Sequence, residues 1–290
     1  MSPGILCLPA RRANKVPIVI MVDGSDDPGS DEDLKAQSMF ASIAHELARR
    51  GIASWRYETP SKHWQAIAPG RSPLDFYITD DAVAALGHIA RLPEADPLRI
   101  YILGHGLGGT MAPYIAERYP RAAGIILMAT PESAIEKTLA ERKKTTLEKQ
   151  GLSASEITEQ VKAQNRIFAD IRSGKTPPGR LVLGAPAAYW RDRMNRDPAR
   201  KASVLAIPVL VLQGGKDSEA GEADYDRMQS VLGRKKNGKA DFHWFPTLDH
   251  WFTRSDTTKS GEAGSNSVDE EAVRLVADWI KLHSAPSAGN

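Results

Sequence analysis

Four short runs of apolar residues recur along the chain, and each is nearly continuous rather than alternating between apolar and polar positions. Runs of this kind are typical of parallel strands that are covered by helices on both faces of a sheet. The pattern therefore predicts a sheet whose strands are mostly buried. The runs occupy residues 18–22, 100–103, 124–128 and 208–212, and weaker strand candidates lie at 52–57 and 240–245.

Helical periodicity fills the segments between these runs. Residues 33–50 end before Gly51, a residue type that commonly terminates helices, and residues 107–119 stop before Pro120. Further helices are expected at 75–92 and 268–283. Strands that alternate with helices in this way predict an α/β fold built on a doubly wound, mostly parallel sheet.

The alternation breaks between residues 131 and 203, where the sequence contains no convincing strand. This segment has instead two charged helical stretches, at 132–149 and 154–173, followed by a short third helix. We therefore expect a helical cap formed by residues 131–203, inserted into a core formed by residues 1–130 and 204–290.

Composition narrows the class of protein further. The chain has 290 residues, 41% hydrophobic and 26% charged, and its 38 basic residues nearly balance 36 acidic ones, which gives no basis for nucleic-acid or membrane binding. The single cysteine, Cys7, permits no internal disulfide. No run approaches the ~20 apolar residues of a membrane span, and no secretory signal is recognisable at the N-terminus. We expect a cytoplasmic protein, unless a leader was removed.

The stretch GHGLGG, residues 104–109, directly follows a strand candidate and fits two different loops. It satisfies the dinucleotide-binding pattern G-x-G-x-x-G, which normally follows the first strand of its domain and needs an acidic residue at the end of the next strand. Here other strands come first, and the next strand offers Glu132 only after a proline. The stretch also matches the nucleophile elbow G-x-S-x-G, except that Gly106 stands at the nucleophile position.

An acid and a histidine follow this stretch in the order that an elbow requires. Asp217 comes shortly after the strand predicted at 208–212, and His250 shortly after the strand predicted at 240–245. Strand-end loops are expected to bring both side chains beside position 106. Because motif, order and strand position agree, the sequence favours the elbow over the dinucleotide loop.

With these motifs, the chain resembles an α/β-hydrolase-fold protein of the serine carboxylesterase and dienelactone-hydrolase type. The matching pieces run almost from end to end of the chain. They are GILCLP before the first core strand, VDGSDD at the oxyanion loop, GHGLGG at the elbow, GAPAAYW in the cap, IPVLVLQGGKD at the acid and FPTLDHWF at the histidine. The resemblance implies hydrolysis of a small-molecule ester or lactone without a cofactor.

The resemblance also implies roles for individual residues. Asp217 would be the triad acid and His250 the general base. The backbone N–H of Leu107, with that of Ser25 or its neighbour, would form the oxyanion hole.

A substrate pocket is expected between the carboxyl edge of the sheet and the cap. Trp251, which adjoins His250, is the best candidate for lining it, followed by Trp190 and Trp64, with simple packing as the alternative for all three. No cysteine and histidine ligand spacing occurs, so we expect no metal. The oligomeric state is left open.

A glycine at position 106 leaves no hydroxyl to form an acyl-enzyme, and three interpretations remain. Gly106 can be an introduced or recent replacement of serine in an esterase, which gives an inactivated or substrate-trapping form. The chain can instead be a naturally non-hydrolytic protein that binds a small molecule. In the third interpretation, His250 held by Asp217 activates a water molecule in the space that a serine would fill.

Overall fold

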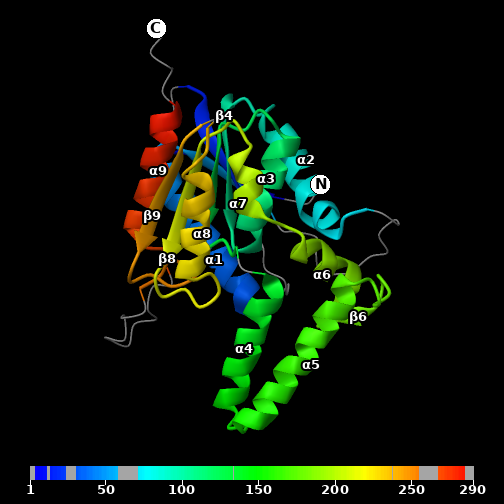
Figure 1. Ribbon diagram of the computed structural model, residues 1–290. Coiled ribbons are helices and arrows are strands. Elements are labelled where there is room, and N and C mark those ends of the chain that lie inside the picture. Colours follow the sequence, from blue (N-terminus) through cyan, green and yellow to red (C-terminus); the bar gives the residue numbers. More distant parts are fainter. Residues whose placement is uncertain are drawn as a thin grey trace. The chain divides into compact units, whose positions relative to one another are not determined.

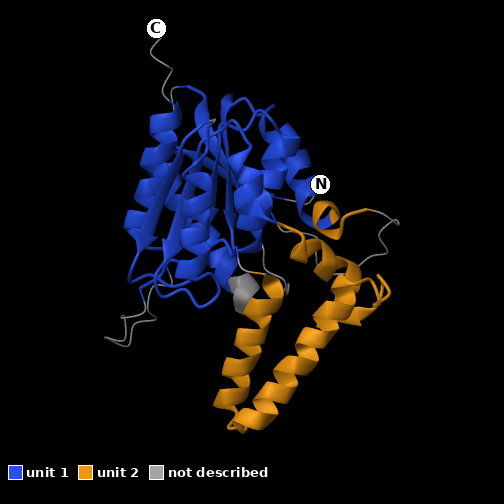
Figure 2. Ribbon diagram, in the orientation of Figure 1, with its two compact units in different colours: residues 1–62, 77–132, 197–290 blue, residues 63–76, 133–196 orange. Residues whose placement is uncertain are grey.

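The structure, a computed structural model, describes most of the chain in two compact units. The described residues are 4–11, 14–23, 31–57, 71–132, 134–236, 238–254 and 267–284. Unit 1 comprises the described residues of segments 1–62, 77–132 and 197–290, and unit 2 comprises those of segments 63–76 and 133–196 (Figure 2).

Unit 1 is built on a single large sheet (Figure 1). Its strands are β1 (Gly4–Cys7), β2 (Val16–Val22), β3 (Ala53–Tyr57), β4 (Ala95–His105), β5 (Gly124–Met128), β8 (Val209–Gly214) and β9 (Ala240–Phe245). They lie in the order β1-β3-β2-β4-β5-β8-β9, in which β1 pairs antiparallel with β3 and the other neighbours pair in parallel. The predicted α/β fold with a mostly parallel sheet is confirmed.

Helices cover both faces of this sheet. They are α1 (Asp31–Arg49), α2 (Asp80–Ile89), α3 (Leu107–Arg118), α7 (Pro198–Ser203), α8 (Glu222–Leu232) and α9 (Glu270–Ser284), with a π-helical turn η1 (Asp75–Thr79) before α2. Helices α1 and α9 contact each other on one face, whereas α3 contacts both α2 and α7 on the other face, where α7 also contacts α8 (Figure 1). The sheet is therefore the middle layer of three.

Burial on both faces explains the continuous apolar runs of the sequence. In β2, Val19 and Met21 belong to the same core cluster as residues of α1 and α9. Their neighbours Ile18 and Ile20 point to the opposite face and are only 1% and 0% exposed. A central parallel strand has no solvent-facing side, so polar residues at alternate positions would be buried rather than exposed to water.

Unit 2 is mainly helical. It contains α4 (Ile135–Lys149), α5 (Ala154–Arg172), α6 (Ala187–Met194) and an antiparallel pair of two-residue strands, β6 (Leu181–Val182) and β7 (Ala185–Pro186). Helix α5 begins with a capping box, in which the Ser153 hydroxyl accepts the Glu156 N–H and the Glu156 carboxylate accepts the Ser153 N–H. The long helices match the two that were predicted, whereas strands of two residues carry no periodicity from which to predict them.

The unit boundaries differ from the predicted cap of residues 131–203. Residues 197–203, which include α7, group with unit 1, and the described residues of segment 63–76 group with unit 2. Helix α7 contacts α3 and α8. Such long-range packing is not encoded in local periodicity, so the sequence pattern could not assign this segment to the core.

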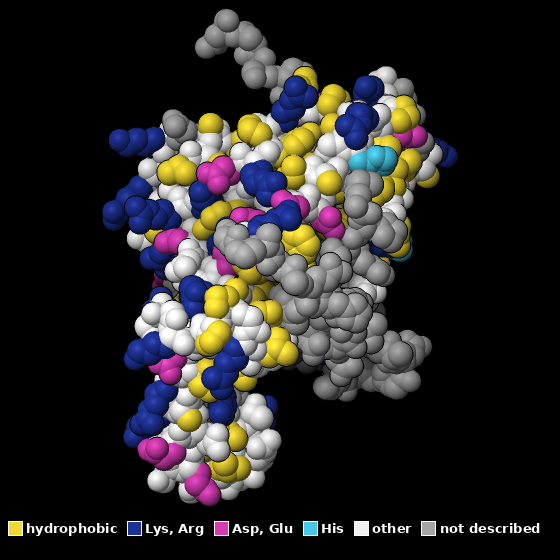
Figure 3. Space-filling model, turned by 90° about the vertical axis from the view of Figure 1, so that its right-hand side faces the viewer, with side chains coloured by type: hydrophobic (Ala, Val, Ile, Leu, Met, Phe, Trp, Pro, Cys, Tyr) yellow, Lys and Arg dark blue, Asp and Glu magenta, His cyan; other side chains and the backbone are white. Residues whose placement is uncertain are grey.

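The surface carries charge of both signs. On the face shown in Figure 3, basic and acidic side chains are interspersed with apolar ones over the described residues. This mixture agrees with the balance of 38 basic and 36 acidic residues in the chain. Within the described part of the chain, no helix combines the length and the apolar character needed to cross a membrane.

Candidate active site

The stretch GHGLGG forms a sharp turn from strand β4 into helix α3. The strand ends at His105, the helix begins at Leu107, and Gly106 between them has φ 55° and ψ −120°. The Gly106 N–H donates to the Met128 carbonyl at 3.0 Å, and its carbonyl accepts the Thr110 N–H at 3.1 Å. These bonds hold position 106 in a left-handed conformation that side chains rarely adopt, which is the backbone geometry of a nucleophile elbow.

The flanking glycines are required by close backbone contacts. A Cβ atom on Gly104 would lie 2.2 Å from the Gly108 carbonyl oxygen. A Cβ atom on Gly108 would lie 2.0 Å from the Val22 carbonyl oxygen. A larger residue at position 104 would therefore push α3 away from β4, and one at position 108 would push α3 away from β2, so both glycines are needed, as the sequence pattern predicts for an elbow.

The acid and histidine loops are joined where strands β8 and β9 end. Gly215 N–H donates to the Phe245 carbonyl at 2.7 Å, and Lys216 N–H donates to the Leu248 carbonyl at 2.9 Å. These bonds bring Asp217 beside His250, whose Nδ1 lies 2.9 Å from Asp217 Oδ2 and 3.0 Å from Oδ1. The structure thus brings together the two residues that the sequence proposed as acid and base.

Asp217 is buried and held by several donors. Its side chain is 0% exposed, and it accepts the Gln213 side-chain amide at 3.0 Å and the backbone N–H groups of Glu219 and Ala220 at 2.7 and 3.0 Å. Burial alone would raise its pKa, but the hydrogen bond and charge of His250, together with the two backbone donors, outweigh burial and lower the pKa. Asp217 is therefore an ionised carboxylate that orients the imidazole.

Position 106 faces the other nitrogen of that imidazole. A Cβ atom built on Gly106 would lie 3.7 Å from His250 Nε2 and 3.9 Å from Cε1, and these are the atoms of described residues within 4 Å of it. A hydroxyl one bond further along a side chain at this position can reach hydrogen-bonding distance of Nε2. The backbone and the histidine are arranged for a nucleophile that the glycine does not carry.

A second carboxylate also reaches this nitrogen. Glu219 Oε2 lies 3.4 Å from His250 Nε2, and the Glu219 side chain is 25% exposed. Glu219 could not be identified from the sequence, because it lies two residues beyond the acid in a loop whose path a linear pattern does not define.

His105, which occupies the variable position of the elbow, supports the histidine loop. It is 2% exposed, and its Nε2 lies 2.8 Å from the His250 carbonyl oxygen. Since a carbonyl only accepts, Nε2 carries the proton of this hydrogen bond. Burial, assisted by the charge of His250, lowers the pKa of His105 to about 3, so this ring stays neutral.

The turn around His250 is shaped by Asp249. Its Oδ1 accepts the Trp251 N–H at 3.0 Å and the Thr253 N–H at 2.9 Å, and its Oδ2 accepts the Thr253 hydroxyl at 2.9 Å. An aspartate that hydrogen-bonds the backbone two residues ahead fixes a tight turn. The sequence signal was available in the Asp-His pair, but it also fits an ordinary surface turn.

The structure describes three of the other predicted site residues, Leu107, Trp251 and Trp190. Leu107 is the first residue of α3, so its N–H has no acceptor within the helix and stands at the positive end of the helix dipole, as an oxyanion donor should. Trp251 is half-buried, and its ring centroid lies 5.1 Å from that of His250. Trp190 is 5% exposed in unit 2, where its indole N–H donates to the Val182 carbonyl at 2.7 Å. Ser25 and Trp64 lie outside the described residues.

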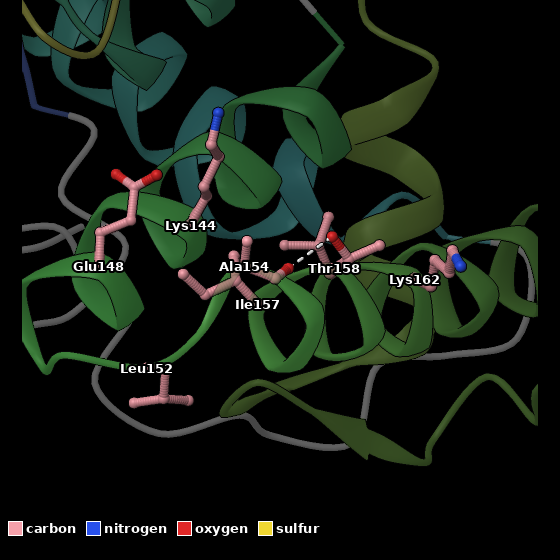
Figure 4. A pocket seen from close by; sticks show the side chains of 8 residues that line it. Lys144, Glu148, Leu152, Ala154, Ile157, Thr158 and Lys162 are labelled. Carbon is pink, nitrogen blue, oxygen red and sulfur yellow. Dashed lines mark hydrogen bonds between the residues drawn. The ribbon is translucent and has the colours of Figure 1, made fainter.

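Unit 2 has a hollow of its own. It has a volume of about 560 Å³ and is lined by side chains of both α4 and α5, including Lys144, Glu148, Ile157 and Lys162 (Figure 4). None of the residues that the sequence proposed for the site lines it. Among the described residues, no group of three or more His, Cys, Asp or Glu side chains is placed to hold a metal ion.

A mostly parallel sheet with a strand–turn–helix elbow, followed in chain order by an acid loop and a histidine loop, defines the α/β-hydrolase fold. Comparison with known proteins supports this class. The chain is 30% identical over 280 residues to Esterase EstD of Thermotoga maritima, and the match covers 96% of this chain and 65% of the length of that esterase. No family model matches the chain.

Solved structures share the fold at low sequence identity. Est1E from Butyrivibrio proteoclasticus has a TM-score of 0.60 at 16% identity, and the match covers 98% of this chain and 94% of that one. The α/β hydrolase GrgF from Penicillium has a TM-score of 0.57 at 15% identity, with 98% and 94% covered. Acetyl xylan esterase 1 from Thermoanaerobacterium has a TM-score of 0.53 at 13% identity, with 97% and 79% covered. The chain therefore has the α/β-hydrolase fold, and it spans just under two thirds of the length of the esterase that it matches.

Proposed function

We propose that this site is built for Ser-His-Asp hydrolysis of small carboxylic esters or lactones, and that Gly106 blocks its first chemical step. The observation that carries the proposal is the distance of 3.7 Å between a Cβ atom at position 106 and His250 Nε2. The intact pair of His250 and Asp217, 2.9 Å apart, supports it further. A sequence relative that is named an esterase supports this substrate class.

The roles follow from the geometry of the residues. With a serine at position 106, His250 Nε2 would take the hydroxyl proton while the oxygen attacks the ester carbonyl. Asp217 would stabilise the imidazolium, and the Leu107 N–H would donate to the oxyanion. The imidazolium would then return its proton to the leaving alcohol, and water would hydrolyse the acyl-enzyme. Without the hydroxyl, the ester binds but no acyl-enzyme forms.

The direct test is to restore the hydroxyl. Gly106→Ser is expected to raise the hydrolysis of a short activated ester by roughly 10³-fold or more over the parent chain. Gly106→Ala is the matched control, because it has the same backbone constraint and no hydroxyl. If Gly106→Ser is folded but no more active than Gly106→Ala, the esterase proposal is wrong, and a small-molecule-binding function takes its place.

Hydrolysis by activated water is a second candidate, because the space beside His250 Nε2 at position 106 holds no side chain. In this route Asp217 orients His250, His250 takes a proton from water, and the hydroxide attacks the carbonyl directly; the bond to the alcohol then breaks, and the imidazolium returns its proton to that alcohol. The parent chain would then hydrolyse esters slowly, and His250→Ala would abolish that activity. An unchanged rate in His250→Ala would eliminate this candidate.

A further inference from the structure

The imidazole of His250 lies between two carboxylates, one at each ring nitrogen. Asp217 Oδ2 is 2.9 Å from Nδ1, and Glu219 Oε2 is 3.4 Å from Nε2. In a Ser-His-Asp site the second nitrogen faces the serine hydroxyl instead. Glu219 therefore lies beside His250 Nε2, the atom that must accept a proton during catalysis.

The two carboxylates belong to the same turn. The Glu219 N–H donates to Asp217 Oδ1 at 2.7 Å, so the backbone of Glu219 is fixed by the residue that orients His250. The Asp217 side chain is 0% exposed, whereas that of Glu219 is 25% exposed. Asp217 is thus the buried partner of the imidazole, and Glu219 is the partner that reaches solvent.

Two carboxylate partners favour the doubly protonated ring. A carboxylate only accepts hydrogen bonds, so both ring nitrogens must carry protons if both contacts are to be favourable. Opposite charges this close also stabilise the charged form of the imidazole. His105 is another titratable group beside the ring, with its ring centroid 4.5 Å away, and it is neutral because burial lowers its pKa to about 3. It therefore adds no positive charge to oppose this effect.

We propose that Glu219 is a positioning residue that holds His250 as an imidazolium while position 106 lacks a side chain. An imidazolium has no free lone pair and cannot act as a base, so this proposal also opposes hydrolysis by activated water in the parent chain at any pH below the His250 titration midpoint. A serine introduced at position 106 must compete with Glu219 for Nε2, so Glu219 restrains the reaction at low pH. The effect on rate depends on the proposed esterase function, whereas the effect on protonation does not.

The protonation of His250 is tested in the Gly106 chain itself by NMR titration of labelled histidine rings. The His250 signal is assigned by its loss in His250→Asn. Glu219→Gln keeps the shape of the side chain and removes its charge, and it is expected to lower the titration midpoint of His250 by about one pH unit. Glu222→Gln removes the same charge from an exposed position on α8 and is the matched control. An unchanged midpoint in Glu219→Gln, or an equal change in Glu222→Gln, overturns the proposal.

A kinetic experiment extends the test to the reaction. The pH dependence of kcat/KM is measured for Gly106→Ser with and without Glu219→Gln. The acid limb is expected to move about one unit lower in the double variant, which is a tenfold higher rate on that limb. A purely structural role would change kcat without moving the limb, and an unmoved limb contradicts the proposal. If both variants are inert, the esterase function fails, and the NMR titration still decides the role of Glu219.

Discussion

His105 donates a hydrogen bond from its buried side chain to the backbone carbonyl of His250, with Nε2 and the oxygen 2.8 Å apart. The ring that precedes the elbow thereby holds the loop that carries the proposed base. The ring is buried, so adding a proton to it is unfavourable in the folded state, and this links the stability of the protein to pH.

Acid should destabilise the protein through His105. Its pKa is lowered to about 3 by burial, whereas the same ring in the unfolded chain titrates near 6.5. Below pH 6.5 the unfolded state binds a proton that the folded state does not, so the free energy of unfolding falls as pH falls toward 3. When the pH is lowered from 7 to 5, the free energy of unfolding of the parent should fall by about 2 kcal/mol more than that of His105→Gln. Urea unfolding measures both values. Parallel losses in the two proteins would contradict this assignment.

Glu132 should act in the opposite direction. Its side chain is 1% exposed, and burial raises its pKa to about 7 even though Arg227 and the Ala199 N–H oppose the shift. Between about pH 4.5 and 7 the folded state retains a proton that the unfolded state loses, so this group's contribution to stability falls as pH rises. We therefore compare the unfolding free energy of the parent with that of Glu132→Gln. The parent value minus the variant value should decline by about 1 kcal/mol per pH unit across this range. A difference that stays flat or rises across this range would show that the folded state does not retain this proton.

A side chain at position 106 should cost stability. Gly106 has φ 55°, which is unfavourable for any other residue, so Gly106→Ala is expected to lower the unfolding free energy by about 1–3 kcal/mol. Gly87→Ala is the control, because Gly87 lies in α2 and an added Cβ would have nothing within 4 Å of it. Alanine has the higher helix propensity, so this variant should be slightly more stable than the parent. Equal effects of the two substitutions would mean that the elbow is not strained.

Asp217 should be essential once the hydroxyl is restored. Asp217→Asn in the Gly106→Ser background removes the charge that stabilises the imidazolium and is expected to lower kcat by about 10³–10⁴-fold. Asp226→Asn, on the exposed side of α8, is the matched control and should leave kcat unchanged. A loss below tenfold in Asp217→Asn would remove Asp217 from the proposed triad.

Much of the fold was predictable because parallel strands carry a simple signal. The apolar runs at 100–103 and 124–128 lie in β4 and β5, and the elbow, Asp217 and His250 lie at the ends of strands, where the sequence predicted them. Helices α7 and α8 were not among the predicted helices, and α7 is too short to show a clear period. Their place depends on long-range packing, which a local pattern does not contain.

The immediate surroundings of His250 were less predictable than the pair it forms with Asp217. Glu219 and His105 contact His250 through the path of one loop and through the side chain at the elbow's variable position. An acidic or imidazole side chain in a loop has many ordinary explanations, so neither was distinguishable from a surface or packing residue in the sequence. Only the distances from Glu219 and His105 to His250 in the folded protein distinguish these contacts from ordinary surface or packing positions.

The central claim is that His250 is positioned to activate a nucleophile at position 106. A fluorophosphonate reagent tests this without a substrate, because an activated serine oxygen bonds to phosphorus and expels fluoride, and the product is detected by intact mass. We expect one phosphonyl group to be added to Gly106→Ser, and none to the parent, to Gly106→Ala or to Gly106→Ser with His250→Ala. Folded Gly106→Ser that remains unlabelled, or that is labelled equally without His250, would contradict the account.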